Sequence, residues 1–109
     1  MRATVLALMV GLAIPAAAAA QDAKVAKGAE VYAAQKCGMC HSIGDKGNKK
    51  GPLDGVASKL SADDIRSWIT DAKGMIAKTK PTRKPEMKAF TLPKEDVDAL
   101  VAYLTTLKQ

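Results

Sequence analysis

The sequence contains few aromatic residues and few of the side chains that usually bind metals or carry out acid–base chemistry. Its 109 residues include two cysteines, one histidine, one tryptophan, two tyrosines and one phenylalanine. A disulfide between Cys37 and Cys40 would close a loop too short to stabilise the fold much. No segment alternates apolar with polar residues, so a β-sheet is not expected. A core this poor in large side chains usually needs a metal or another non-protein filler.

The first twenty residues have the pattern of a secretory signal peptide. Arg2 gives a short basic start, residues 5–14 are largely apolar, and a run of alanines precedes Gln21. The apolar run is too short to be a convincing transmembrane helix. We therefore predict cleavage after Ala20, which leaves one domain of residues 21–109 in the periplasm.

The charge balance points toward an acidic protein partner. Removal of Arg2 with the signal peptide lowers the formal net charge only from +6 to +5. Five lysines and arginines lie between residues 78 and 88, without aromatic residues among them. Nucleic-acid binding is therefore not indicated, and attraction to an acidic protein surface is the better interpretation.

Three segments predict helices, so the expected fold class is all-α. The first runs from an N-cap at about residue 22 to residue 36, and the last covers residues 94–107. The second begins after Ser61, which forms a capping box with Asp64, and ends at Gly74. The glycine-rich stretch between the first two predicts a loop.

Cys37, Cys40 and His41 form the one concentrated cluster of ligand side chains, and three chemistries compete for it. A structural zinc site would need further cysteines or histidines that the chain does not have. Dithiol exchange would need a preceding strand, whereas a helix is predicted there. Cys-x-x-Cys-His is also the attachment signature of c-type haem, with both sulfurs on one face of a turn and the imidazole following at once. This pattern favours one covalent haem c.

Taken with this motif, the sequence resembles the class I cytochrome c family over nearly the whole of residues 21–109. The resemblance rests on "KGAEVYAAQ", "CGMCH", "GPLDG" and "ALVAYLTTL", in that order. It implies the cytochrome c fold, with three main helices and long loops wrapped around one haem. In that family the first and last helices cross with a glycine against an aromatic residue, and Gly28 and Tyr103 match these positions. Such a crossing would explain a glycine inside a helix, where it costs about 1 kcal/mol relative to alanine.

The second axial ligand of the iron is expected to be a methionine. No histidine follows His41, so two histidines cannot ligate the iron in a monomer. Met39 lies within the attachment motif and cannot reach the opposite face. The resemblance implies Met87, in the loop "KPEMKAF", while Met75 and Lys80 remain alternatives.

Two further residues are expected near the haem. The resemblance implies that the carbonyl of Pro52 accepts a hydrogen bond from the His41 ring, which would fix its orientation. We also expect Trp68 to line the haem.

The function that the resemblance implies is one-electron transfer, without catalytic residues. The expected protein is a periplasmic carrier, monomeric or in transient complexes, that docks on the acidic surfaces of its redox partners. One alternative is the electron-accepting subunit of a dehydrogenase. A different class, a ligand sensor or peroxidase, would need an open sixth position on the iron.

Overall fold

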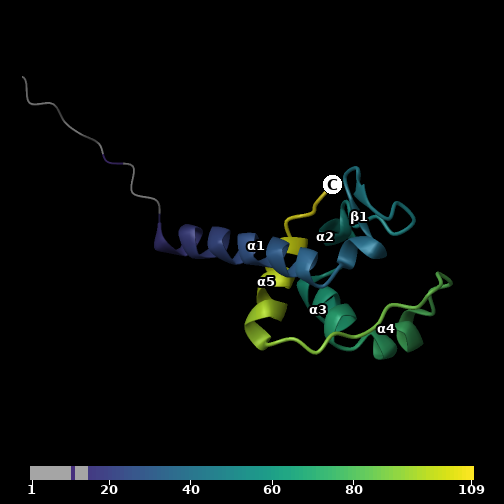
Figure 1. Cartoon of the computed structure of the whole chain (residues 1–109). Coiled ribbons are helices and arrows are strands. Elements are labelled where there is room, and N and C mark those ends of the chain that lie inside the picture. Colours follow the sequence, from purple (N-terminus) through teal and green to yellow (C-terminus); the bar gives the residue numbers. More distant parts are fainter. Residues whose placement is uncertain (1–10, 12–14) are drawn as a thin grey trace, which may run out of the picture.

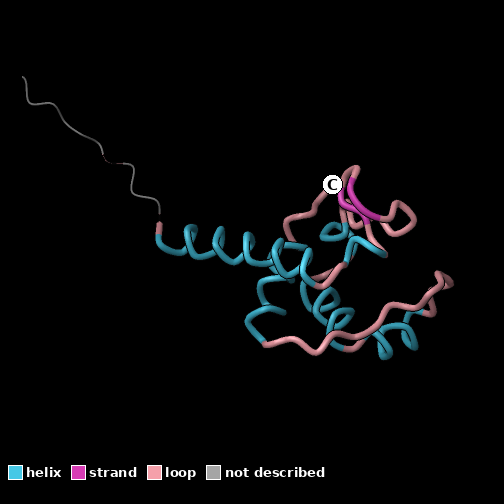
Figure 2. The backbone as a smooth tube through the Cα atoms, viewed as in Figure 1, coloured by secondary structure: helices cyan, strands magenta, loops and turns pink. Residues whose placement is uncertain are grey.

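The computed structural model describes Gly11 and residues 15–109, and the described chain is mostly helical (Figures 1 and 2). The all-α prediction is therefore confirmed, with one small β-hairpin that the sequence did not indicate. Two two-residue strands form this hairpin and pair antiparallel, with Ser42 opposite Gly47. In chain order the elements are α1 (Ala16–Ala34), the 3₁₀ turn η1 (Cys37–Met39), β1 (Ser42–Ile43), β2 (Lys46–Gly47), α2 (Val56–Lys59), α3 (Ala62–Thr70), α4 (Ala72–Thr79) and α5 (Lys94–Leu104).

The first helix begins earlier than predicted. Its N-cap is Pro15, seven residues before the expected N-cap at Asp22, and its first residue is Ala16. Alanine has the highest helix propensity, so the alanine run extends the helix at its exposed end. The predicted apolar run of the signal peptide lies almost entirely outside the described residues, and the cleavage site stays a prediction. In the described part of the chain, no helix is both long and apolar enough to span a membrane.

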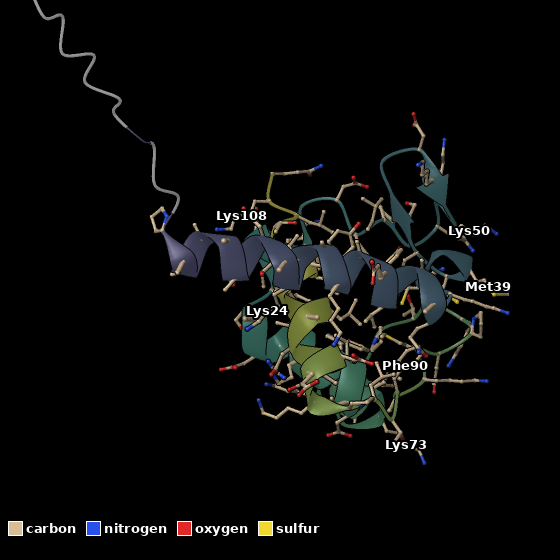
Figure 3. All side chains as sticks on the ribbon, turned by 60° about the vertical axis from the view of Figure 1, so that its left-hand side comes forward. Lys24, Met39, Lys50, Lys73, Phe90 and Lys108 are labelled. Carbon is tan, nitrogen blue, oxygen red and sulfur yellow. The ribbon has the colours of Figure 1, made fainter. Side chains whose placement is uncertain are left out.

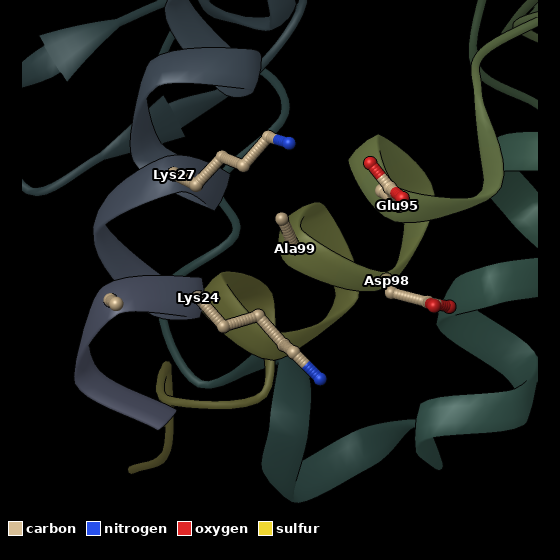
Figure 4. A pocket seen from close by; sticks show the side chains of 6 residues that line it. Lys24, Lys27, Glu95, Asp98 and Ala99 are labelled. Atoms are coloured by element: carbon tan, nitrogen blue, oxygen red, sulfur yellow. The ribbon is translucent and has the colours of Figure 1, made fainter. Parts of the chain in front are cut away.

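The crossing of α1 and α5 is the main helix contact, and it confirms the packing expected for Gly28. A Cβ atom at Gly28 would overlap the carbonyl oxygen of Ala99 and lie 2.5 Å from Cβ of Tyr103. Figure 4 shows the two helices at this crossing, with Ala99 on α5 and Lys27 on α1. Close by, the rings of Tyr32 and Tyr103 meet edge to face, with centroids 5.8 Å apart. A residue without a side chain is therefore required where the two backbones approach.

Replacing Gly28 with alanine is expected to lower the stability of the holoprotein by about 1–3 kcal/mol. The added methyl group meets backbone atoms of α5, which cannot rotate away as a side chain could, so the helices must separate. For a domain of this size, each kcal/mol lowers the melting temperature by about 4–8 °C. Thermal unfolding followed by circular dichroism measures the change.

The matched control is Glu30→Ala, because Glu30 is exposed on the same helix. Exposed substitutions of this kind change stability by less than about 0.5 kcal/mol. Equal melting temperatures for the two variants would contradict the close helix crossing.

The helix predicted from Ser61 to Gly74 is in fact two helices. Its start is as expected, since the Ser61 hydroxyl accepts a hydrogen bond from the backbone N–H of Asp64 at 3.1 Å. The chain then breaks at Asp71, whose backbone leaves the helical region and whose carboxylate accepts from the N–H of Gly74 at 3.2 Å. Asp71 thus caps α4, because a carboxylate satisfies the unpaired N–H groups of a new helix. Gly74 lies inside α4, which corrects the prediction that it ends a helix.

The core lies where α1, α3 and α5 meet. The last predicted helix has the expected apolar stripe, but it ends at Leu104 instead of Leu107. Leu107 still packs against the core from the turn that follows. The buried core residues are Val31, Ile65, Ile69, Val97, Leu100, Val101 and Leu104.

Candidate functional site

An apolar cavity of about 710 Å³ lies between the helical core and the segment that joins α4 to α5. Its size falls within the range of about 300–1,000 Å³ that is typical of ligand sites. In Figure 1 this segment runs along the side of the molecule opposite the hairpin. Apolar side chains form most of the wall: Tyr32, Leu53, Val56, Leu60, Ile65, Trp68, Ile69, Phe90, Leu100 and Leu104.

Cys37, Cys40 and His41 enter the cavity from a single tight turn. The backbone N–H groups of Cys40 and His41 both donate to the carbonyl of Cys37, at 3.1 and 2.9 Å. Both cysteines are unpaired thiols; Cys37 is half-buried and Cys40 exposed. Burial is the largest cause that raises the pKa of the Cys37 thiol, which favours its neutral form. The turn therefore presents two thiols and an imidazole to one apolar space.

The His41 ring is oriented by a backbone carbonyl. Nδ1 lies 3.0 Å from the carbonyl oxygen of Gly51. Since a carbonyl can only accept, Nδ1 carries the proton and Nε2 keeps a lone pair for a metal. Burial, and then the positive charge of Arg83, lower the pKa of His41, while the hydrogen bond to Gly51 opposes them. The ring is thus held as a neutral imidazole ready to act as a ligand.

The acceptor is Gly51, and the prediction of the Pro52 carbonyl is wrong by one residue. The N–H of Ser42 also donates to the Gly51 carbonyl, at 3.1 Å, and the N–H of Leu53 donates to the carbonyl of Ser42, at 2.8 Å. These two bonds pair Ser42 with Pro52 as a parallel bridge, which turns the Gly51 carbonyl toward His41. Pro52 is exposed and does not line the cavity, whereas Leu53 does.

Met87 lines the cavity, and the two alternative ligands do not. Met87 is half-buried in the segment between α4 and α5. Met75 is buried within α4 and lies outside the cavity wall. Lys80 caps the C-terminus of α4, where it is exposed. Met39 reaches the rim from the attachment turn itself and is 71% exposed.

Trp68 lies in the cavity wall, and its contact with the haem stays a prediction. It comes from α3, whose two buried neighbours Ile65 and Ile69 also line the cavity. Residues 81–89 are called the Met87 segment. The N–H of Phe90 donates to the carbonyl of Ile69 at 2.8 Å and ties the end of this segment to the same helix. The core helices thus form the inner wall of the site.

Sequence reasoning missed two polar side chains at the site. Arg83 donates from Nη2 to the carbonyl of Cys40 at 2.6 Å. The hydroxyl of Tyr32 is buried and has no hydrogen-bond partner among the residues that the structure describes, and burial is the main cause that raises its pKa to about 12. In the sequence, Arg83 is one of five lysines and arginines between residues 78 and 88, and Tyr32 is one of two tyrosines, so neither carries a separate signal.

The donor set of the cavity fits a covalently attached haem. Two unpaired thiols can form thioether bonds, Nε2 of the His41 imidazole keeps a lone pair, and Met87, whose side chain carries a thioether, lines the mostly apolar wall from a different segment. A zinc site finds no support, because no group of three or more His, Cys, Asp and Glu side chains comes together within the described residues.

A mostly helical domain with an apolar cavity and a Cys-x-x-Cys-His turn defines a class, the small c-type haem proteins. The family model for cytochrome c matches residues 25–108, and the chain belongs to the cytochrome c family. Membership implies a covalent haem c and a part in electron transfer.

One curated relative is cytochrome c oxidase subunit 2 of Alkalihalophilus pseudofirmus. It is 29% identical in an alignment of 91 residues that covers 75% of this chain and 25% of the relative. The chain thus spans about a quarter of the length of this relative. No solved structure gives a significant match.

Proposed function

We propose that the chain is a periplasmic monohaem cytochrome c that carries single electrons between redox enzymes, with its iron held between His41 and Met87. The observation that carries this proposal is one mostly apolar cavity lined both by the attachment turn and by Met87. When bound, the haem supplies an iron that accepts and releases one electron.

The residues of the chain would then have distinct roles. Cys37 and Cys40 would tether the haem, and His41 would bind the iron through Nε2 while the Gly51 carbonyl keeps its ring in place. The Met87 thioether would complete the coordination and favour the ferrous state, which raises the reduction potential. The apolar wall would exclude water. No side chain has to move a proton, so the proposed activity is transfer without catalysis.

Absorption spectra of the oxidised and reduced holoprotein test this function. We expect the weak near-infrared band of sulfur-to-iron charge transfer in the ferric form and slow binding of carbon monoxide to the ferrous form. A missing band together with rapid carbon monoxide binding would instead favour a ligand sensor or peroxidase with an open sixth position.

Docking on acidic partner surfaces is proposed from the charges around the cavity. Lys36, Arg83 and Lys88 lie among its lining residues, and Glu86 is the acidic residue there. Glu86 pairs with Lys84 at 2.8 Å, which leaves the rim with net positive charge. An opposing acidic surface would be attracted most strongly where electrons enter and leave.

Oxidation of the ferrous protein by anionic ferricyanide is expected to slow about threefold as ionic strength rises from low to physiological values. The double variant Lys36→Gln/Lys88→Gln should lose most of this salt dependence. The control is Lys24→Gln/Lys108→Gln, because Figure 3 shows both lysines away from Met39 and the attachment turn. Stopped-flow rates measure the effect, and equal salt dependence in both double variants would rule out local steering.

A second candidate is an electron-transfer subunit within a larger oxidoreductase. This candidate is favoured by the similarity to a cytochrome c oxidase subunit. The match covers only a quarter of the length of that subunit. The earlier alternative, the electron-accepting subunit of a dehydrogenase, belongs to the same class. Size-exclusion chromatography of a native periplasmic extract distinguishes them: a free carrier elutes at the size of one small domain, and a subunit elutes with its complex.

A further inference from the structure

Arg83 connects the segment that carries Met87 to the turn that carries His41. Its Nη2 atom donates to the carbonyl of Cys40 at 2.6 Å, across 43 residues of sequence. The rest of the guanidinium lies against Gly51, because a Cβ atom added at Gly51 would overlap both the guanidinium and the Cys40 carbonyl. Arg83 therefore contacts the backbone that holds the His41 ring in place.

This contact is the polar anchor of the Met87 segment. Within the described chain, no other hydrogen bond or ion pair joins residues 81–89 to the rest of the protein. Lys84 and Glu86 pair with each other inside the segment, and the next anchor is the backbone bond from Phe90 to Ile69. Without Arg83, nine residues would be held only by apolar contacts, and a loop so weakly tied opens more often.

Arginine suits this role better than other cations. Its planar guanidinium can lie flat on the glycine while one N–H group donates to the carbonyl, and a hydrogen bond from a charged donor is stronger than one between neutral groups. Lysine could make the hydrogen bond but could not cover Gly51 in the same way.

We propose that Arg83 is a positioning residue that clasps the Met87 segment closed over the cavity and so restrains Met87 beside the site. The clasp rests on the hydrogen bond to Cys40 and the packing on Gly51. The further step, that the clasp favours ligation of the iron by Met87, also rests on the proposed function.

The test compares Arg83→Gln with Lys84→Gln in the holoprotein. Both variants lose one positive charge from the same segment, but within the described residues the Lys84 side chain forms its ion pair with Glu86, inside that segment. Lysyl endopeptidase can report opening at Lys88–Ala89, because Lys80 and Lys84 are both followed by proline and resist cleavage. We expect cleavage of Lys88–Ala89 to be about fivefold faster in Arg83→Gln than in Lys84→Gln, since it follows the population of the open segment.

Carbon monoxide binding to the ferrous form is the second measurement. A rate about fivefold higher in Arg83→Gln than in Lys84→Gln supports a clasp that restrains the iron ligand. A third outcome is faster cleavage of Arg83→Gln together with carbon monoxide binding that is already rapid in the unmodified protein. This outcome would support the clasp but contradict ligation of the iron by Met87. Equal cleavage rates in Arg83→Gln and Lys84→Gln would overturn the clasp, whatever the ligand.

Discussion

Replacing Met87 with leucine is expected to remove the near-infrared band of the ferric holoprotein and to speed carbon monoxide binding to the ferrous form on the order of 100-fold. Leucine keeps the volume of the side chain but has no sulfur. With Met87 bound, the form of the protein whose sixth iron position is open would be populated to about 1%. Without the Met87 sulfur, that position would be open to carbon monoxide in every molecule. The reduction potential should fall by about 100 mV or more, because axial ligands set most of its range.

Met75→Leu and Lys80→Gln are the matched controls. Met75 is buried away from the cavity and Lys80 is exposed at the end of α4. Both variants should keep the band, the slow carbon monoxide binding and the potential of the unmodified protein. A band that survives in Met87→Leu and disappears in Met75→Leu would transfer the ligand role to Met75. An unmodified protein without the band, in which only Lys80→Gln speeds carbon monoxide binding, would transfer that role to Lys80.

Replacing both Cys37 and Cys40 with serine is expected to abolish covalent haem, from one per chain to about zero. Serine hydroxyls do not form the thioether bonds that the thiols make, so any haem present would separate under denaturing conditions. The protein should also lose most of its fold, because the apolar cavity would have no tethered filler. A haem stain on a denaturing gel and far-ultraviolet circular dichroism measure the two effects.

Met39→Leu is the control for the cysteine variant. Met39 lies between the two cysteines and is 71% exposed, so its replacement should leave attachment and folding unchanged. Each single cysteine variant should retain haem through the remaining sulfur. Full staining of the double variant would contradict attachment through these cysteines.

The parts of the fold that could be predicted from the sequence depend on short-range patterns. Cys37, Cys40 and His41 lie within one turn, and the Ser61 cap acts over three residues, so their geometry follows from their spacing. Gly28 was predictable for a different reason, since a glycine inside an amphipathic helix indicates a close neighbour.

The features that could not be predicted depend on contacts between distant segments. Hydrogen bonds with the backbone of Ser42 decide whether the carbonyl of Gly51 or that of Pro52 faces His41. The two carbonyls have the same chemistry, so the sequence does not distinguish them. Arg83 is distinguished from its cationic neighbours by a contact with Cys40, 43 residues away. The break between α3 and α4 at Asp71 was not predicted, because Gly74 is the stronger sequence signal for the end of a helix. In the structure the backbone leaves the helical conformation at Asp71, three residues earlier.

Covalent haem attachment is tested most directly by the intact mass of the protein after export and denaturation. We predict the mass of the chain from Gln21 onward plus one haem, because thioether bonds survive denaturation. The mass of the bare polypeptide would contradict the covalent haem on which the proposed electron transfer depends.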